Sequence, residues 1–203
     1  IRLSLVGSEM CIRDRHTGGL EGIVTQTMFY PQEKLGIVIL TNQQSGAAFR
    51  AISNTIKDFY LKNPSTDWVK TYDDMMKKNV EEADVITDEV WKTVEANQKN
   101  KAIKFDSKSV IGTYKDNWFG DVVIYEKKGK IIFESKRSPQ LTGEMSFYKD
   151  NTFAVKWYNR YFHADAFVYA EMKDGKMTGF KMRAISPLTD FSYDFQDLDF
   201  TRK

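Results

Sequence analysis

The sequence predicts an α+β protein in which a β-hairpin and a helix are followed by a helical linker and an eight-stranded antiparallel β-barrel. Three observations support this. Two apolar, β-branched runs flank a Pro-containing turn between residues 22 and 42. Apolar side chains then recur every three or four residues as far as residue 101. From about residue 107 they alternate with polar ones, as in strands.

The predicted hairpin turns at residues 31–34, where Pro31 fixes φ and polar residues follow. Residues 35–41 are apolar almost throughout, so we expect this strand to be buried on both faces. The hairpin is preceded by four small or polar residues: His16, Thr17, Gly18 and Gly19.

These four residues suit a binding site. A substrate can approach the two glycines closely, because they carry no Cβ. The Gly19 N–H is a candidate donor to a developing oxyanion, with the His16 and Thr17 side chains beside it. The alternative is that the tetrapeptide is only a polar turn before a strand.

A first helix is predicted over residues 47–62, with Ser45 as its N-cap and Pro64 ending it. Its apolar residues are spaced by three and four and should lie on the hairpin. They are Phe49, Ile52, Ile56, Phe59 and Tyr60. Because few strands are available to cover it, we expect this stripe to remain partly exposed.

Residues 66–101 are predicted to be helical, with Ser65 or Thr66 as the cap and breaks near Asn79 or Thr87. Charged residues dominate after residue 77. This segment is interpreted as a solvated linker with one docked face; a partner-binding helix is the alternative.

Eight strands are predicted in the last hundred residues, at the spacing of an up-and-down barrel. They span residues 110–114, 121–126, 130–135, 141–148, 152–158, 164–172, 176–185 and 190–200. Turns with Gly or Asn at positive φ are expected at residues 127–129, 149–151 and 173–175. Large rings should fill the barrel: Trp118, Phe119, Phe133, Phe147, Trp157, Tyr161, Phe167 and Phe180. The alternative is a ligand cavity, for which the polar candidates are Arg137, Arg160, His163, Asp165 and Arg183.

Charge and composition argue against several functions. Lys plus Arg number 30 and Asp plus Glu 28, so no basic signature for nucleic acid is present. We expect no membrane span, because no apolar run is long enough. The single cysteine, Cys11, excludes an internal disulfide. His163 has no partners at ligand spacing, and the acidic residues of 190–199 point to both strand faces, so no metal and no cofactor are expected.

Residues 1–15 do not read as a signal peptide, because charged residues interrupt every apolar stretch. The string IRLSLVGSEMCIRDR resembles the translated read-through of a sequencing adapter. We therefore expect residues 1–15 to be a non-native segment.

The string HTGGLEG, the hairpin and LGIVILTNQQSGAA together resemble the C-terminal end of serine β-lactamase-like and penicillin-binding-protein-like hydrolases of the class C type. The resemblance implies that His16, Thr17 and Gly18 are the substrate-binding triad on the strand that edges the active site. It implies that Gly19 supplies an oxyanion-hole N–H in the parent enzyme. The usual triad begins with Lys, and here His16 takes that place.

The resembling family also needs Ser-x-x-Lys and Tyr-x-Asn motifs ahead of the triad. The sequence has no Tyr-x-Asn, and its one Ser-x-x-Lys, residues 146–149, follows the triad within a predicted strand. The resemblance therefore implies a truncated hydrolase domain that is inactive alone. Its parent would act on a small-molecule or peptide substrate, and many such parents are periplasmic or secreted.

The barrel segment also has a resemblance. The strings GTYKDNWFGDVVIYEKKGKIIF and FKMRAISPLTDFSYDFQDLDF resemble the lipocalin-like C-terminal module, a domain of unknown function, that some of these hydrolases carry. The expected division is residues 1–15 non-native, 16–63 hydrolase end, 64–102 linker and 103–203 barrel. The competing function is a non-catalytic barrel that binds a ligand or forms a homo-oligomer.

Overall fold

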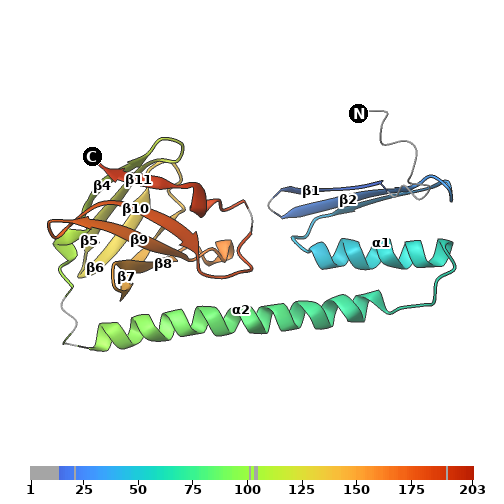
Figure 1. Ribbon diagram of the computed structural model, residues 1–203, viewed down its shortest axis with the longest axis horizontal. Helices are drawn as coiled ribbons and strands as arrows, with labels where there is room; N and C mark the ends of the chain where they lie inside the picture. The colour runs from blue at the N-terminus through green and yellow to red at the C-terminus, as the bar shows by residue number, and fades with distance from the viewer. Residues whose placement is uncertain (1–13, 21, 101, 103–104, 191) are drawn as a thin grey trace. The chain divides into compact units, whose positions relative to one another are not determined.

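The structure is a computed structural model that describes residues 14–20, 22–100, 102, 105–190 and 192–203. It contains two compact units, Ile1–Asn79 and Val80–Lys203 (Figure 1). The first holds a three-stranded sheet and a helix, and the second holds a closed eight-stranded barrel, which confirms the predicted α+β class. Most of the predicted non-native segment, including Cys11, lies outside the described residues.

The sheet of the first unit has the strand order β1-β2-β3, all antiparallel. Strands β2 (Ile23–Tyr30) and β3 (Leu35–Thr41) form the predicted hairpin. Strand β1 (Asp14–Leu20) pairs with β2 from Asp14↔Phe29 to Leu20↔Ile23. The tetrapeptide therefore lies within a strand, and the alternative of a simple polar turn is wrong.

Helix α1 (Gly46–Tyr60) covers one face of this sheet (Figure 1). It begins at the predicted N-cap, where the Ser45 Oγ accepts a hydrogen bond from the Ala48 N–H at 3.4 Å. The core between helix and sheet consists of five buried apolar side chains, which are Met28, Tyr30, Ile37, Ile39 and Phe49. On α1, only Phe49 and Ile56 of the predicted stripe pack into this core, whereas Ile52, Phe59 and Tyr60 are exposed.

The opposite face of the sheet is apolar and uncovered by any described residue. Val38 and Leu40 on β3 are 62% and 76% exposed, and Phe29 on β2 is 49% exposed. The expectation that residues 35–41 are buried on both faces is therefore wrong. Strand β3 has the composition of a two-sided core strand, but α1 supplies a layer on only one side.

This face predicts a measurable property. A hydrophobic dye such as anilinonaphthalene sulfonate should bind the folded chain, because contiguous exposed apolar surface is where such dyes bind. The double variant Val38→Thr, Leu40→Thr places β-branched residues, which suit strands, at both positions and should markedly lower the dye fluorescence. Trp118→Ser, which removes an exposed ring from the barrel, serves as the control and should not. An unresponsive wild-type sample with native circular dichroism would contradict the prediction.

Helix α2 (Trp68–Lys99) runs for 32 residues without a break, so the expected interruptions near Asn79 and Thr87 are wrong. The Thr87 hydroxyl donates to the Ala83 carbonyl one turn earlier, as Thr side chains inside helices can do. The cap is Asp67 instead of Ser65 or Thr66: its Oδ1 accepts the Lys70 N–H at 2.9 Å. Neither helix of the described residues has an apolar stretch long enough to span a bilayer.

The start of α2 is attached to α1 by two polar contacts. The Trp68 Nε1–H donates to Asp58 Oδ2 at 2.6 Å, and the Asn54 Nδ2–H donates to the Tyr72 hydroxyl at 3.0 Å. The Lys57 ammonium lies 5.4 Å from the centre of the Trp68 ring, within cation–π range. These contacts place Tyr72 beside α1.

The barrel closes in the order β4 to β11, because β11 pairs with both β10 and β4. Its strands are β4 (Gly112–Asp116), β5 (Gly120–Lys127), β6 (Lys130–Ser135), β7 (Thr142–Lys149), β8 (Thr152–Trp157), β9 (Ala166–Lys173), β10 (Lys176–Ala184) and β11 (Asp199–Arg202). This is the predicted up-and-down antiparallel barrel. Short 3₁₀ turns are found at Ser107–Ser109, Arg160–Phe162 and Phe195–Asp197.

The last predicted strand, residues 190–200, is largely wrong, since only Asp199–Arg202 is a strand. The Asp190 side chain accepts hydrogen bonds from the Ser192 N–H and hydroxyl, which forms a turn instead. Phe195 leaves the alternation and stacks on Trp157 inside the barrel, with ring centres 6.3 Å apart. In the turn at residues 149–151, φ is positive at Asp150 and not at Asn151 as expected.

The barrel interior is filled by aromatic and aliphatic side chains. Phe133, Trp157 and Phe180 are at most 1% exposed and pack edge to face at centre distances of 5.4 to 5.9 Å. Trp118 and Tyr161, which were expected inside, are 63% and 91% exposed.

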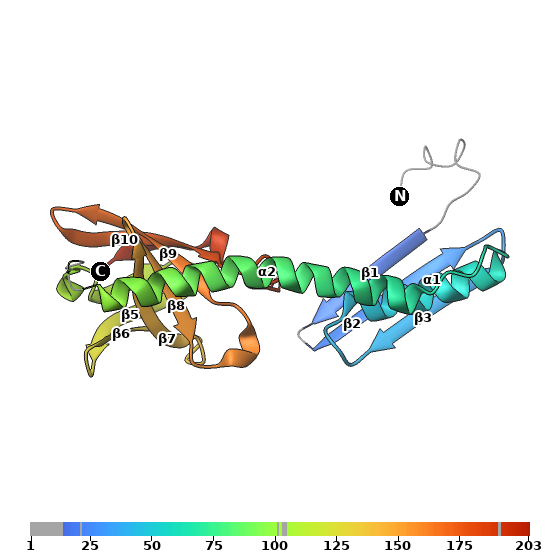
Figure 2. The same cartoon turned by 90° about the horizontal axis from the view of Figure 1, so that it is seen from below.

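The barrel's outer wall carries the second half of α2 (Figure 2). Val90 and Val94 of the helix form a buried cluster with Ala154 of β8 and Ile185. Phe167, another ring expected inside, borders this outer cluster. Ala154 is fully buried although it points outward, so its small side chain lets the helix approach closely.

Candidate functional site

The four residues predicted as a site all lie on β1, an edge strand of the described sheet, and every residue of β1 is exposed. Leu20 pairs with Ile23 across a two-residue connection, which makes them a hydrogen-bonded pair. Antiparallel pairs alternate between hydrogen-bonded and non-bonded. Gly19 and Thr17 are therefore non-bonded positions, and their N–H and C=O groups point away from β2 into the free edge.

The side chains of His16 and Thr17 lie on opposite faces of the sheet, because successive strand residues alternate. Thr17 is opposite Gln26 on the α1 face, while His16 is opposite Thr27 on the apolar face. The strand thus brings Gly19, Thr17 and His16 to one edge but not to one face. Their assignment as a substrate site stays a prediction.

Gly18 lies directly against a side chain of β2. A Cβ at this position would lie 2.9 Å from the Thr25 Oγ1, closer than real contacts allow. The Thr25 hydroxyl also donates to the Gly18 carbonyl, at 3.4 Å. Any larger residue must displace Thr25 from this hydrogen bond.

The single Ser-x-x-Lys of the sequence is engaged elsewhere. The Ser146 hydroxyl accepts a hydrogen bond from the Gln98 side chain of α2 at 3.1 Å. The Lys149 ammonium lies 5.2 Å from the centre of the Tyr148 ring. These partners favour the interpretation that the motif occurs here by chance.

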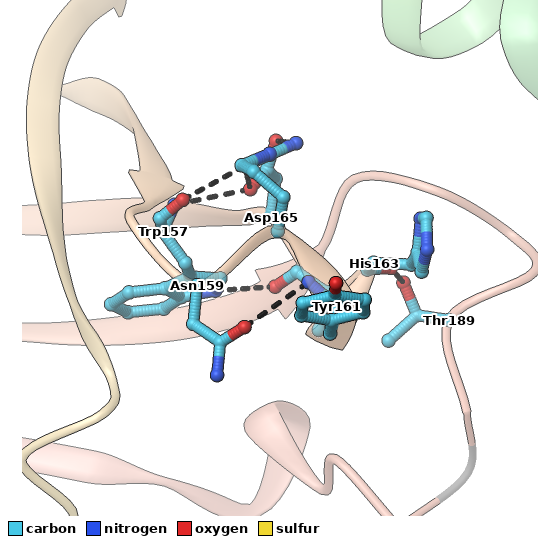
Figure 3. A network of polar contacts seen from close by, with 8 residues as sticks. Trp157, Asn159, Tyr161, His163, Asp165 and Thr189 are labelled. Carbon is cyan, nitrogen blue, oxygen red and sulfur yellow. Dashed lines mark hydrogen bonds and ion pairs between the residues drawn. The ribbon is translucent and has the colours of Figure 1, made fainter.

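Two of the polar barrel candidates come together at the β8–β9 loop (Figure 3). Asp165, 8% exposed, receives hydrogen bonds from Arg160 at 2.6 and 2.9 Å and from the Trp157 N–H at 3.2 Å. The hydrogen bond to Asp165 is the main reason that the pKa of Arg160 is raised. This bidentate pair fixes the loop conformation.

The remaining candidates are dispersed. His163 has a left-handed backbone (φ 45°), and its carbonyl accepts a hydrogen bond from the Thr189 hydroxyl at 3.3 Å (Figure 3). The Arg137 guanidinium donates to the Trp118 carbonyl at 2.7 Å. Arg183 lines a separate groove of about 610 Å³ with Phe167 and Tyr169. Within the described part of the chain, no three His, Cys, Asp or Glu side chains are placed to hold a metal ion.

Sequence reasoning missed a polar centre at one end of the barrel. Arg202 donates to the Met177 and Ile111 carbonyls, and its guanidinium lies 5.5 Å from the centre of the Tyr114 ring. Tyr114 is fully buried and donates to the Val110 carbonyl at 2.7 Å. Burial raises the pKa of Tyr114 to about 12, so its hydroxyl stays protonated as a structural donor. No local signal marks Arg202, because its partners are 25 or more residues away.

One comparison with known families identifies the barrel. The sequence pattern of a domain of unknown function (DUF3471) matches residues 99–202, about half of the chain, and this range contains all eight barrel strands. No curated protein matches the chain. The chain therefore belongs to the DUF3471 family.

Proposed function

We propose that this chain is the C-terminal portion of a serine hydrolase of the β-lactamase-like type and is inactive by itself. The observation that carries the proposal is the Gly19 peptide on the fully exposed strand β1, whose N–H points into the free edge. The uncovered apolar face supports it, because a larger domain would place a further layer there.

In the parent enzyme, a serine outside the described residues would attack an amide or ester carbonyl, and the Gly19 N–H would stabilise the tetrahedral oxyanion. Thr17 and His16 would orient the substrate, and Gly18 would let it lie against the strand. A neutral His16 holds a carboxylate less firmly than the usual lysine does. Peptidase or esterase action on a small molecule or peptide is therefore favoured over β-lactam hydrolysis.

The first test uses the chain as it is. We expect no turnover of a chromogenic cephalosporin or a short-chain p-nitrophenyl ester above background, because the described residues offer no activated nucleophile. Heat-denatured protein sets the background. Turnover that follows the folded protein through purification would overturn the assignment of an inactive portion.

The second test uses the upstream reading frame. We expect it to encode Ser-x-x-Lys and Tyr-x-Asn, and the joined chain to hydrolyse the ester. Gly19→Pro removes the N–H at a position the β1–β2 ladder does not use, and should lower kcat about 10²–10³-fold. Gly19→Ala retains the N–H and separates this loss from the effect of added carbon. Equal activity of the Pro and Ala variants would exclude Gly19 from the oxyanion hole.

A non-catalytic binding role for the barrel is the second candidate, favoured by the groove beside Arg183. Its walls combine Phe167 and Tyr169 with a guanidinium that has no hydrogen-bond or ion-pair partner among the described residues. A ligand that raises the Tm of the wild type but not that of Arg183→Ala would support this role.

A further inference from the structure

A polar cavity lies in the first unit, on the α1 side of the sheet. Its volume is about 460 Å³, and its walls come from β1, β2, α1 and the start of α2. The side chains that carry the argument are Thr17, Gln26, Arg50, Ser53, Asn54 and Tyr72. His16 borders it, although the His16 side chain belongs to the other face of the sheet.

The charge of this cavity is positive. Arg50 and Arg15 both line the cavity, and none of its described lining residues is an Asp or Glu. Neither guanidinium has a hydrogen-bond or ion-pair partner among the described residues; Arg50 only lies 5.8 Å from the Phe49 ring centre. Arg15 falls in the predicted non-native segment, so Arg50 is the cation that matters for a ligand.

The Gln26 amide is an unmet polar group in the same cavity. Gln26 is 5% exposed, and its Oε1 has no hydrogen-bond partner in the described part of the chain. A buried polar atom without a partner is destabilising by about 1–3 kcal/mol. A half-turn of the amide exchanges its oxygen and nitrogen, so the group can present an N–H or a carbonyl to a ligand. In the orientation described, the Oε1 needs a donor, whereas the Arg50 guanidinium in the same cavity needs an acceptor, so the two together point to a bound group that both donates and accepts.

Hydroxyl groups complete the lining. The Tyr72 hydroxyl accepts from Asn54 at 3.0 Å, so its own proton is available to another acceptor. Thr17 is the cross-strand neighbour of Gln26 and lies on the same face. Arg50, Tyr72 and Thr17 are therefore donors around a cavity that lacks a carboxylate.

We propose that this cavity binds a small oxyanion that also carries a hydrogen-bond donor, held chiefly by Arg50 and Gln26. Both a hydrogen phosphate group and the carboxylate of an N-acylated amino acid have this chemistry, with a P–OH or an amide N–H as the donor. Charge-assisted hydrogen bonds from a guanidinium are the strongest that a protein can offer such groups. The cavity shares Thr17 with the strand edge, but its positive charge and its unmet amide come from Arg50 and Gln26, so this proposal does not depend on the hydrolase proposal.

The test is isothermal titration calorimetry of the full chain at constant ionic strength. Inorganic phosphate and N-acetylglycine are the two probes, and sodium chloride is the blank. We expect one of them to bind saturably with a stoichiometry near one. Phosphate alone would identify a phosphoryl ligand, and N-acetylglycine alone a carboxylate. No saturable heat from either probe would overturn the proposal.

Variants assign the binding to this cavity. Arg50→Gln should weaken the bound probe at least tenfold, and Tyr72→Phe should weaken it less. Gln26→Leu should weaken it as well, although it relieves the buried amide. Arg137→Gln, which removes a guanidinium on the barrel, should bind as the wild type does.

Two results would contradict this assignment. Wild-type affinity in Arg50→Gln, with native circular dichroism, would do so. Loss of binding in Arg15→Gln with retention in Arg50→Gln would do so as well. If Arg50→Gln fails to fold, Tyr72→Phe and Gln26→Leu decide, and wild-type affinity in both rejects the site. Because the readout is binding and not turnover, failure here leaves the hydrolase proposal untouched.

Discussion

A Gly143→Val variant is expected to lose the barrel fold. Gly143 of β7 is opposite Trp157 of β8, where the two strands approach so closely that no side chain fits. A Cβ there would lie 2.3 Å from the Lys156 carbonyl oxygen and 2.9 Å from the Trp157 Cα. Both are backbone atoms, so relief requires separating the strands and moving the most buried tryptophan. We expect a loss of ~4 kcal/mol or more in the free energy of unfolding.

The measurement is urea unfolding followed by tryptophan fluorescence, together with near-ultraviolet circular dichroism. Gly36→Val is the matched control, because Gly36 is also a strand glycine and its Cβ would lie 3.6 Å from the Phe29 ring, an ordinary contact. The control should unfold within about 1 kcal/mol of the wild type. A wild-type midpoint for Gly143→Val would show that β7 and β8 are not packed as described.

Asp116→Ala is expected to weaken the pairing of β11 with β4, which closes the barrel. The Asp116 carboxylate, 7% exposed, accepts N–H groups from Trp118 at 2.7 Å, Phe119 at 2.6 Å and Asp199 at 3.0 Å. The first two are in the β4–β5 turn, and the third begins β11. Removing the carboxylate leaves three donors without partners, so we expect a loss of about 3 kcal/mol.

The same contacts predict a dependence on pH. Burial is the largest single influence on Asp116 and raises its pKa, but the three N–H groups together outweigh it and lower the pKa. A carboxyl with a lowered folded-state pKa stabilises the fold above its unfolded pKa of about 3.9, and this stability is lost as the pH falls through the folded value. The difference between wild type and Asp116→Ala should therefore shrink below about pH 4.

Urea midpoints at pH 7, 5, 4 and 3 measure both effects of Asp116. Asp121→Ala is the control, because Asp121 pairs with Lys203 on the surface, and such pairs contribute about 0–1 kcal/mol. A constant difference across this pH range would contradict the hydrogen-bonding role assigned to the carboxylate. Equal losses of stability in Asp116→Ala and Asp121→Ala would show that the three hydrogen bonds of Asp116 contribute no more than a surface ion pair.

The parts of the fold that could be predicted from sequence are those that depend on local pattern. Seven of the eight strands follow the alternation of apolar and polar residues, and the hairpin follows Pro31. The last strand was predicted to begin too early because Phe195 lies in a short 3₁₀ turn and packs on Trp157, a contact across 38 residues that the local sequence does not reveal. The breaks predicted in α2 failed because Asn79 and Thr87 are only mildly unfavourable in a helix, and no Gly or Pro interrupts Trp68–Lys99.

The candidate site was predictable only in part, for a similar reason. The identity of the four residues comes from the sequence, but the outward direction of the Gly19 N–H depends on the register with β2. Burial on both faces of β3 was inferred from composition, whereas burial requires a second layer. The Arg50 and Gln26 cavity involves four separate elements, and no local motif brings them together.

The packing of α2 on the barrel has a practical consequence for protein engineering. The family match begins at residue 99, yet Val90 and Val94 already belong to a cluster that shields Ala154 and Ile185 from water. A graft that starts at residue 99 would lack Val90 and Val94, and would leave the apolar side chains of Ala154 and Ile185 exposed to water. A fusion protein that uses this barrel should therefore begin at Val80, so that it includes the part of α2 that packs on the barrel.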